Sequence, residues 1–203
     1  MSGKLLAFKR PDVSMTEQLS DQALVAACAT GDTAALGALF DRHNRGVYAF
    51  LSRLAGTDER DLDDLVQATF LAALRAAKNY RGDAPVHRWL FGIAAHCVRH
   101  HVRSEIRRKS FATKYADAPK KKITEPVMHI ERAQLIQQVR AALDDLPERQ
   151  RTVYVMCELE EIPGVEVART LDMREGTVWR LLHQARNALR DALGEAAATR
   201  RVP

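Results

Sequence analysis

The sequence has little of what a β-sheet protein requires. Only 6% of its 203 residues are aromatic, and it holds 10 glycines and 7 prolines. Alternating patterns with β-branched runs are absent, whereas Ala, Leu, Arg, Glu and Gln dominate the stretches in which apolar residues recur at helical spacing. The composition and the periodicity therefore predict an all-α fold.

Long apolar runs are also missing, so no membrane-spanning helix is expected. Charged residues or histidines interrupt every apolar stretch well before about 18 residues. The apolar run in the segment MSGKLLAFKRPDVS is four residues long, which is too short for the core of a secretory leader. We therefore expect a cytoplasmic protein with no membrane insertion.

Cysteine is scarce, and its placement does not suggest a disulfide framework. The three cysteines, Cys28, Cys97 and Cys157, are far apart and form no CxxC pair, which favours a reducing compartment. The segment HCVRHH at 96–101 holds two pairs of possible metal ligands four residues apart, but the pairs point in different directions on a helix. We expect neither a metal nor another cofactor.

Motifs of catalysis and of nucleotide binding are absent as well. The sequence contains no GxxxxGK or GxGxxG phosphate loop and no HExxH or GxSxG motif, so no catalytic residues are expected and an enzyme is disfavoured. The charge balance indicates an anionic partner instead, because 31 Lys and Arg against 26 Asp and Glu give a net charge of +5.

The periodic segments fall into two groups separated by a basic stretch. Seven Lys or Arg and a single acid occupy residues 107–122, a composition typical of a flexible linker. Two small helical domains joined by a flexible basic linker are therefore predicted. The expected segments are an N-terminal tail at 1–18, a first helical domain at 19–106, the linker at 107–128, a second helical domain at 129–193 and a C-terminal tail at 194–203.

Capping residues mark the helices of the first domain. Ser20 is expected to cap a short helix, and Asp32 a longer one that ends at Gly56. A third helix is expected over residues 58–79, where five acids near its start suit the positive end of the helix dipole. Asp83 is expected to cap a fourth helix.

The fourth helix has an apolar side and a basic side. The apolar side is formed by Val86, Leu90, Phe91, Ile93, Ala94, Cys97, Val98 and Val102. The basic side is formed by Arg88, His96, Arg99, Arg103 and Arg107, with Trp89 and His100 at its edge. Cations beside a flat ring suit an unstacked nucleic acid strand, which could approach closely at Gly92. The same pattern also fits a solvated basic face with Trp89 turned into the core.

The segment IPGVEVARTLDMREGTVWRLLHQARNALRDAL predicts a helix-turn-helix, with helices at 165–171 and 174–193. The residues expected to hold the helices together are Val167, Ala168, Leu171, Val178, Leu182, Ala185 and Leu189. The outward residues are Gly176, Thr177, Trp179, Arg180, His183, Gln184 and Asn187. Arg180 can donate to guanine, Gln184 can bind adenine, and Thr177 can hold a phosphate. An ordinary helical hairpin with a polar face fits the same spacing.

Three ordered motifs, the last of them in two parts, resemble those of a known family. DLDDLVQATFLAAL is similar to region 2.2 of the extracytoplasmic-function (ECF) sigma factors of the sigma-70 superfamily, and YRGDAPVHRWLFGIA to their regions 2.3 and 2.4. LDDLPERQRTVYVMCEL and GTVWRLLHQARNAL are similar to regions 4.1 and 4.2. The resemblance covers nearly the whole chain and implies a sigma-2-like helical bundle followed by a sigma-4-like helix-turn-helix domain.

The resemblance implies an alternative sigma factor that gives RNA polymerase its promoter specificity. Such a protein binds core RNA polymerase at the β′ clamp helices and the β flap, and it acts as a monomer within the holoenzyme. Its two domains recognise promoter DNA, the minus-35 element as duplex and the minus-10 element as an opened strand. An anti-sigma factor is a further implied partner.

The resemblance also assigns residues to three surfaces. Core polymerase binding is implied for Asp61, Asp64, Gln67 and Leu71, which the helical phase places away from the core, while Phe70 is expected to be structural. Minus-10 DNA binding is implied for Tyr80, Arg81, Gly82, Asp83, Arg88, Trp89, His96, Arg99, His100 and Arg103. Minus-35 DNA binding is implied for Thr177, Trp179, Arg180, His183, Gln184 and Arg186.

Some positions depart from the pattern of the family. Gly92 stands where relatives usually have a polar or basic residue, and His96 where they often have Asn. After Gly-Thr-Val, relatives commonly have a basic residue, a small hydroxyl residue and Arg, whereas this chain has Trp179, Arg180 and Leu181. Ala68 stands where relatives commonly have Glu. The promoter preference therefore cannot be copied from the family.

A stand-alone helix-turn-helix transcription regulator is the alternative interpretation. In that case the N-terminal domain would bind a ligand or dimerise, and the protein would protect a specific duplex site without polymerase. The acidic segment DERDLDD and the aromatic-basic face around Trp89 favour the sigma factor.

Overall fold

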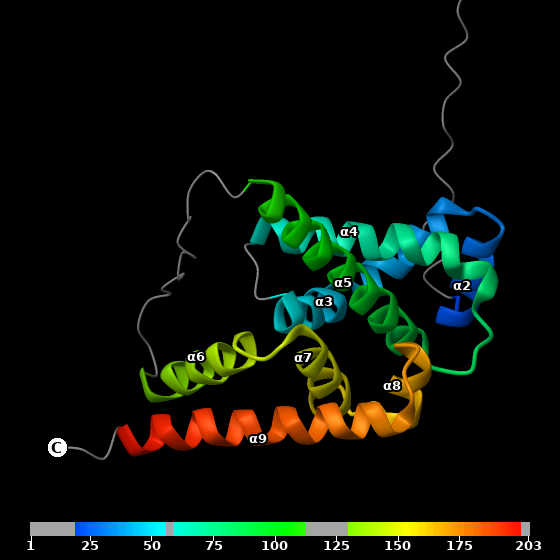
Figure 1. Ribbon diagram of the computed structural model, residues 1–203. Helices are drawn as coiled ribbons and strands as arrows, with labels where there is room; N and C mark the ends of the chain where they lie inside the picture. The colour runs from blue at the N-terminus through cyan, green and yellow to red at the C-terminus, as the bar shows by residue number, and fades with distance from the viewer. Residues whose placement is uncertain (1–18, 56–58, 113–129, 200–203) are drawn as a thin grey trace, which may run out of the picture.

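The computed structural model describes residues 19–55, 59–112 and 130–199, and every regular element within them is helical, so the predicted all-α fold is confirmed. The helices form two bundles (Figure 1). The N-terminal bundle consists of α2 (Asp21–Ala29), α3 (Thr33–Ala55), α4 (Glu59–Ala76), the 3-10 turn η1 (Ala77–Asn79) and α5 (Val86–Ala112). The C-terminal bundle consists of α6 (Ile130–Asp144), α7 (Glu148–Tyr154), the π-helical turn η2 (Val155–Leu159), α8 (Gly164–Thr170) and α9 (Glu175–Thr199).

The first helices begin at the caps that the sequence predicts. The Ser20 hydroxyl accepts a hydrogen bond from the Ala23 amide at 3.2 Å, at the start of α2. Asp32 Oδ1 accepts from the Ala34 amide at 2.8 Å and from the next amide at 3.2 Å, at the start of α3. These side chains satisfy amides that have no partner inside the helix. Gly31 stands between the helices with a φ of +93°, a conformation that glycine adopts without strain.

Both ends of α5 differ from the expectation. The first hydrogen bonds of the helix run from the Arg88 and Trp89 amides to the Pro85 carbonyl, so Asp83 lies before the helix rather than at its cap. At its other end, α5 continues to Ala112, into the segment expected to be the linker. Extending a formed helix adds a hydrogen bond for each residue that is ordered, and this favours continuation into a polar segment. The tail at 1–18 and the linker residues 113–128 lie outside the described residues.

The core of the N-terminal bundle is apolar and includes most of the predicted apolar side of α5. Val86, Leu90, Phe91, Ala94 and Val98 are buried, and Ile93, Cys97 and Val102 are partly buried against them. The rings of Phe50 and Phe91 stack with their centroids 4.5 Å apart. Full burial of a Val, Leu or Phe side chain in this core contributes about 1.5–3 kcal/mol to folding.

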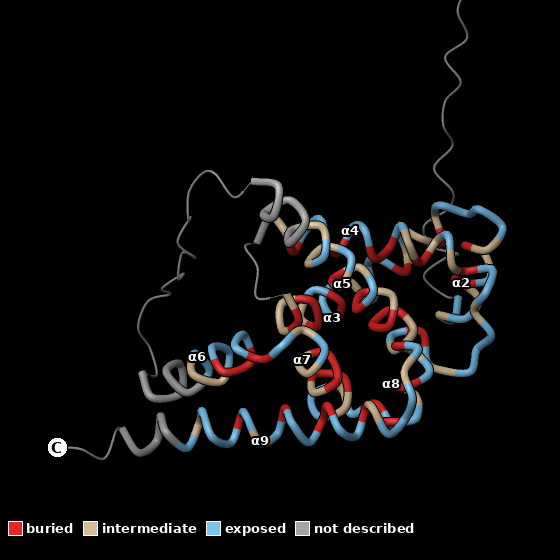
Figure 2. Tube along the Cα trace, viewed as in Figure 1, coloured by how far each residue is buried: buried red, intermediate tan, exposed pale blue. Residues whose placement is uncertain are grey.

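The C-terminal bundle contains the predicted helix-turn-helix, formed by α8 and α9. Asp172 in the turn has a φ of +51°, and Val167 packs in one buried cluster with Val178. Ala185 and Leu189 pack on α6 instead of α8, because α9 is much longer than α8 and extends past it. Figure 2 shows the buried positions of α9 on the side that faces α6 and α7. The helix continues to Thr199, into the segment expected to be a tail.

The two bundles pack against each other, which the sequence does not predict. A cluster of buried side chains contains Phe50, Leu51 and Leu54 from α3 together with Val153, Val155, Met156 and Ile162 from the C-terminal bundle. Arg151 Nη1 donates to the Leu54 carbonyl at 3.0 Å, and Arg53 forms an ion pair with Glu160. The division of the chain into domains at the expected boundaries therefore stays a prediction. Among the described helices, none has the length and apolar character that crossing a membrane requires.

Candidate nucleic-acid interface

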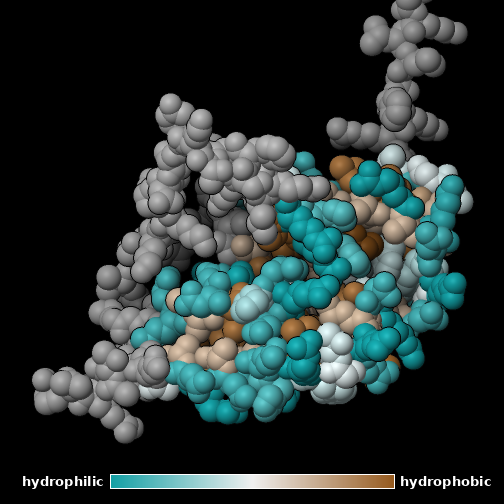
Figure 3. Space-filling model, in the orientation of Figure 1, coloured by the Kyte–Doolittle hydropathy of each residue, from teal (hydrophilic) through white to brown (hydrophobic). Residues whose placement is uncertain are grey.

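The basic side of α5 is only partly open to solvent. His96, His100 and Arg103 are exposed, whereas Arg88 and Arg99 are partly buried. The side chain of Arg107 lies outside the described set. On the face shown in Figure 3, hydrophilic residues cover most of the surface, and hydrophobic residues appear in smaller areas between them.

The turn before α5 is ordered by an aromatic pair. The Tyr80 hydroxyl donates to the Ala84 carbonyl at 2.6 Å, and the Tyr80 and Trp89 ring centroids are 5.0 Å apart. Burial raises the pKa of Tyr80, so its hydroxyl keeps the proton that it donates. Gly82, at the turn, has a φ of +77°. Trp89 is partly buried, so its ring packs on the core and still borders the surface of the turn.

A hollow of about 290 Å³ lies beside this aromatic pair, and we call it the α5–α8 pocket. It is lined by Asn79, Tyr80, Arg81, Asp83, Ala84, Arg88, Trp89, Gly92, Ile93, His96, Glu166 and Thr170. The pocket brings together most of the residues assigned to minus-10 DNA. Gly82, Arg99, His100 and Arg103, assigned to the same DNA, do not line it.

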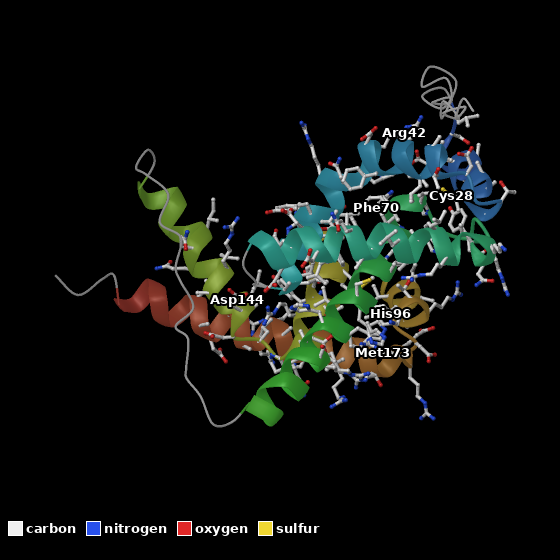
Figure 4. All side chains as sticks on the ribbon, turned by 90° about the horizontal axis from the view of Figure 1, so that it is seen from above. Cys28, Arg42, Phe70, His96, Asp144 and Met173 are labelled. Atoms are coloured by element: carbon white, nitrogen blue, oxygen red, sulfur yellow. The ribbon has the colours of Figure 1, made fainter. Side chains whose placement is uncertain are left out.

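One wall of the pocket comes from α8, which sequence reasoning missed. Arg88 Nη1 lies 3.0 Å from Glu166 Oε2, and His96 Nε2 lies 3.3 Å from the Thr170 carbonyl oxygen. Figure 4 shows His96 on the side of α5 along which α8 passes. A Cβ on Gly92 would lie 2.4 Å from Thr170 Cγ2, so the close approach expected for DNA at Gly92 is made by α8.

The side chains that the sequence predicts to point outward from α9 are mostly exposed in the structure. Trp179, Arg180, His183, Gln184 and Arg186 are exposed, and Thr177 is partly buried. The six-membered part of the Trp179 ring lies over Gly164, where an added Cβ would be 2.9 Å from its nearest ring atom. Arg186 pairs with Glu158 of η2. Leu181 is 8% exposed, so this departure from the family pattern lies in the core and not on the outer face.

The third candidate surface lies on α4. Asp64, Gln67 and Leu71 are exposed, and Asp61 is partly exposed. Leu71 is 54% exposed, which is high for an apolar residue in the middle of a helix. Phe70, one residue away, is 3% exposed, and its predicted structural role is confirmed.

Two aromatic residues next to this surface were missed by sequence reasoning. Phe40 and Tyr48 of α3 are each 37% exposed and line a hollow of about 280 Å³ with Asp63. The sequence places Phe40 among the apolar positions of its helix, and its ring does contact Phe70 edge-on, with centroids 5.0 Å apart. The signal that could have identified the pair is their spacing of eight residues, which puts both on one stripe of α3.

A further hollow, of about 510 Å³, lies between α4 and α5. Its lining includes His96, Cys97, His100 and His101. Burial raises the pKa of the Cys97 thiol, which therefore stays protonated at neutral pH. Across the described residues, no group of three or more His, Cys, Asp or Glu could hold a metal ion.

Comparisons with known proteins identify the family. The sigma-70 region 2 model matches residues 39–108, and the sigma-70 region 4 model matches residues 136–189. The ECF RNA polymerase sigma-E factor of Escherichia coli K12 is 30% identical over 183 residues, which cover 86% of this chain and 95% of that protein. The sigma-E factor of Haemophilus influenzae is 27% identical over 187 residues, which cover 88% and 98%.

Solved structures share the fold. CnrH, in complex with the cytosolic domain of CnrY, aligns with a TM-score of 0.60 and 27% identity over 86% of this chain and 97% of that chain. The sigma factor RpoE of Bartonella quintana, in complex with the anti-sigma factor NepR, aligns with a TM-score of 0.63 and 19% identity over 76% of this chain and 94% of that chain. The chain belongs to the ECF sigma factors of the sigma-70 family, and it is an alternative sigma factor that directs transcription.

Proposed function

We propose that this sigma factor uses three surfaces in promoter recognition. The surface on α4 binds core RNA polymerase, the turn before α5 and the basic side of α5 capture the opened minus-10 strand, and α9 recognises the minus-35 duplex. The observation that carries the proposal is the α5–α8 pocket, in which the Tyr80 and Trp89 rings lie beside the cation of Arg88.

Capture of the minus-10 strand fits the chemistry of that pocket. Extruding a base from the duplex costs a few kcal/mol, and stacking of one base on an aromatic side chain contributes about 1–3 kcal/mol. Arg99 and Arg103, which follow along α5, would neutralise phosphates of the same strand. Strand opening in this scheme is driven by binding, so it requires no nucleotide hydrolysis by the sigma factor, which acts as a regulator and not as an enzyme.

Recognition of the minus-35 duplex fits the exposed face of α9. Arg180 and Gln184 stand one helical turn apart on that face and can contact neighbouring base edges in the major groove. Arg186 is tied to Glu158, and we assign it to the phosphate backbone at the rim of this contact. Trp179 offers an apolar surface for a thymine methyl group.

Binding to polymerase fits the surface on α4. The exposed Leu71 can enter an apolar contact, while Asp64 and Gln67 on the same side of the helix can pair with polar and basic side chains around it. We assign this surface to the β′ clamp helices and the C-terminal bundle to the β flap, with one copy of the chain in each holoenzyme.

An anti-sigma factor completes the proposed set of partners. Solved relatives of similar fold were found in complex with CnrY and with the anti-sigma factor NepR. We propose that an anti-sigma protein likewise sequesters this chain, and that the chain acts in the cytoplasm, where polymerase and promoter DNA are found.

Run-off transcription tests the proposal. Purified bacterial core polymerase would be mixed with this protein and a library of promoter fragments, and matched reactions would omit the protein. Selective transcripts that depend on the protein are the expected result, and their start sites would define both promoter elements. If no transcript forms while the protein alone protects a duplex site from cleavage, the chain acts as a stand-alone regulator and the proposal is wrong.

A further inference from the structure

Gln184, an exposed side chain of α9 that we assign to a base edge, contacts a residue of another helix. Gln150 Nε2 of α7 donates a hydrogen bond to Gln184 Oε1, and the two atoms are 3.3 Å apart. The two residues are 34 positions apart in the chain, so the contact exists only because α7 packs against α9 (Figure 1). A residue outside the three assigned surfaces therefore holds one of the residues within them.

The position of Gln150 is fixed by the start of α7. The Gln150 amide donates to the Pro147 carbonyl at 2.8 Å, which closes the first turn of the helix. The next residue, Arg151, donates to the Leu146 carbonyl at 3.2 Å and ties the helix to the turn that precedes it. Gln150 is itself partly buried, whereas Gln184 is exposed. Of the two side chains, Gln150 is therefore the anchor, and Gln184 is the one that is held.

The bond from Gln150 decides which end of the Gln184 amide accepts and which donates. A glutamine recognises adenine by accepting from N6 and donating to N7 of the base. The Gln184 oxygen has two lone pairs and Gln150 uses one, so the other remains for N6 while Nε2 donates to N7. Turning the amide by 180° would bring its NH2 group against the NH2 group of Gln150. The bond therefore opposes the turned amide.

The turned amide is the form that suits guanine. Guanine carries the acceptor O6 where adenine carries the donor N6. The amide that Gln150 holds would place its oxygen against O6, and two acceptors repel each other. A glutamine without such a partner relieves the repulsion by turning its NH2 group to O6. Discrimination against guanine therefore depends on the cost of breaking the bond between Gln150 and Gln184.

We propose that Gln150 is a positioning residue that makes Gln184 select adenine over guanine in the minus-35 element. Gln150 acts through the Gln184 amide and contacts no base itself. The inference rests on the proposed assignment of α9 to the minus-35 duplex. Arg180, one helical turn before Gln184 on the exposed face, contacts a neighbouring base independently of Gln150 and provides an internal reference.

The test measures base preference at each position of the minus-35 element. Holoenzyme made from core polymerase and the full chain binds a promoter library randomised over this element, and the bound fragments are sequenced. The positions read by Gln184 and Arg180 are those whose preference disappears in Q184A and R180A. Q150L, Q150E and Q150K change the group that meets Gln184. Q137L makes the same change of side chain at an exposed position of α6 and is the matched control.

The Gln150 variants should separate by what they can donate. A contact to both groups of one base discriminates by about tenfold, so the unmodified chain should favour adenine over guanine by about that factor. Q150L removes the donor, and we expect the ratio to fall to about twofold. Q150E can only accept, so it holds the amide turned and should bring the ratio to about one or below. Q150K still donates and should restore the ratio of the unmodified chain, which Q137L should keep.

The charges introduced by two of the variants do not produce this pattern. A charge near the DNA changes the affinity for all fragments alike, because contacts to phosphates carry no sequence information. The ratio between two bases at one position is therefore unaffected by it. The preference at the position read by Arg180 should also stay the same in every Gln150 variant. A merely structural role of Gln150 would instead lower the preference at both positions, and Lys would not restore it.

Three results would overturn the inference. One is a ratio of adenine to guanine that is unchanged in Q150L and Q150E, and another is an equal loss of preference at the position read by Arg180. The third is a Q184A variant that alters no position, or one whose altered position favours a base other than adenine. Each leaves the sigma factor function intact if the unmodified chain supports transcription. Failure of the unmodified chain to direct transcription with core polymerase would instead reject the proposed function itself.

Discussion

Single residues decide how the side chains that we assign to promoter DNA are held in place. Gly164 at the start of α8 supports the Trp179 ring, and Gly92 on α5 admits Thr170. The sequence marks Gly92 as a place of close approach, and the structure shows which group approaches. Nothing in the local sequence pairs Gly164 with Trp179, since the two residues belong to different helices and meet only after the turn has formed.

Gly164→Ala should displace the Trp179 ring and weaken binding to the minus-35 duplex. An added Cβ would be 2.9 Å from the ring, closer than Cβ atoms normally lie to other atoms. Loss of a contact to one base costs about 1–3 kcal/mol, and we expect a loss in that range for holoenzyme binding to minus-35 duplex, measured by electrophoretic mobility shift. Gly194→Ala, where an added Cβ meets nothing within 4 Å, is the control. Equal binding by both variants would show that the position of Trp179 does not matter.

The carboxyl group of Asp21 links stability to pH. Burial acts to raise its pKa, but hydrogen bonds from Arg42 and His43 and their charges outweigh burial, and the pKa lies below its usual value of 3.8. Arg42 Nη1 and His43 Nε2 each lie 2.9 Å from an oxygen atom of the Asp21 carboxylate. A lowered carboxyl pKa stabilises the folded state above the unfolded pKa, and this contribution is lost as pH falls through the folded pKa.

Asp21→Asn should therefore reduce the free energy of unfolding at pH 7, by less than about 1 kcal/mol because the pair is partly exposed. The difference from the unmodified chain should shrink as the pH falls below 3.8. Urea denaturation across this pH range measures it, and Asp63→Asn, at an exposed carboxylate on α4, is the control. A difference that stays constant with pH would contradict the assigned role of the carboxylate.

At the scale of the helix, burial separates the packed side of α4 from the exposed side that we assign to core polymerase. Periodicity was sufficient to predict this separation, because successive helical residues differ by about 100° and neighbours such as Phe70 and Leu71 point to different sides. The caps of α2 and α3 were predictable for a similar reason, since they depend on residues within one turn of the helix start. The ends of α5 and α9 were not, because continuation of a polar helix depends on weak propensities and not on a local stop signal.

Leu71→Ala should weaken binding to core polymerase while leaving the fold intact. Its side chain is 54% exposed, and removing its contact with a partner should cost about 1 kcal/mol, or roughly fivefold in affinity. Competition with a labelled sigma factor for core polymerase measures the loss. Leu19→Ala, at a 39% exposed apolar position before α2 and outside the assigned surfaces, is the control. If both variants compete as well as the unmodified chain, α4 is not the docking surface.

At the scale of the whole molecule, the shared core joins the two bundles into one cooperative unit. Met156 of η2 is fully buried in the same cluster as Phe50 of α3. We therefore expect both bundles to unfold in one transition in denaturant. The two tryptophans report on them separately, because Trp89 lies in the N-terminal bundle and Trp179 in the C-terminal bundle.

Single-tryptophan variants W89F and W179F make this measurable. The fluorescence transitions of the two variants in denaturant should have the same midpoint. Adding Met156→Ala to each variant should lower the free energy of unfolding by about 2–5 kcal/mol, as expected for a buried Met. Circular dichroism on each variant serves as the control that the Phe substitutions keep the helices. Transitions with separate midpoints would mean that the bundles are independent domains, as the linker composition alone predicts.

The sequence by itself determined the all-α class, most helix starts, the apolar and polar sides of α4, α5 and α9, and the motifs of the sigma family. These features depend on residues within a few helical turns of one another, so spacing and capping are enough to predict them. Only the tertiary structure decided that α8 covers α5 and closes the pocket around Arg88. The contacts responsible join residues 78 and 74 positions apart, in the Arg88–Glu166 and His96–Thr170 pairs. Contacts at such separations follow from how whole bundles pack, and the periodicity of a single helix carries no information about them.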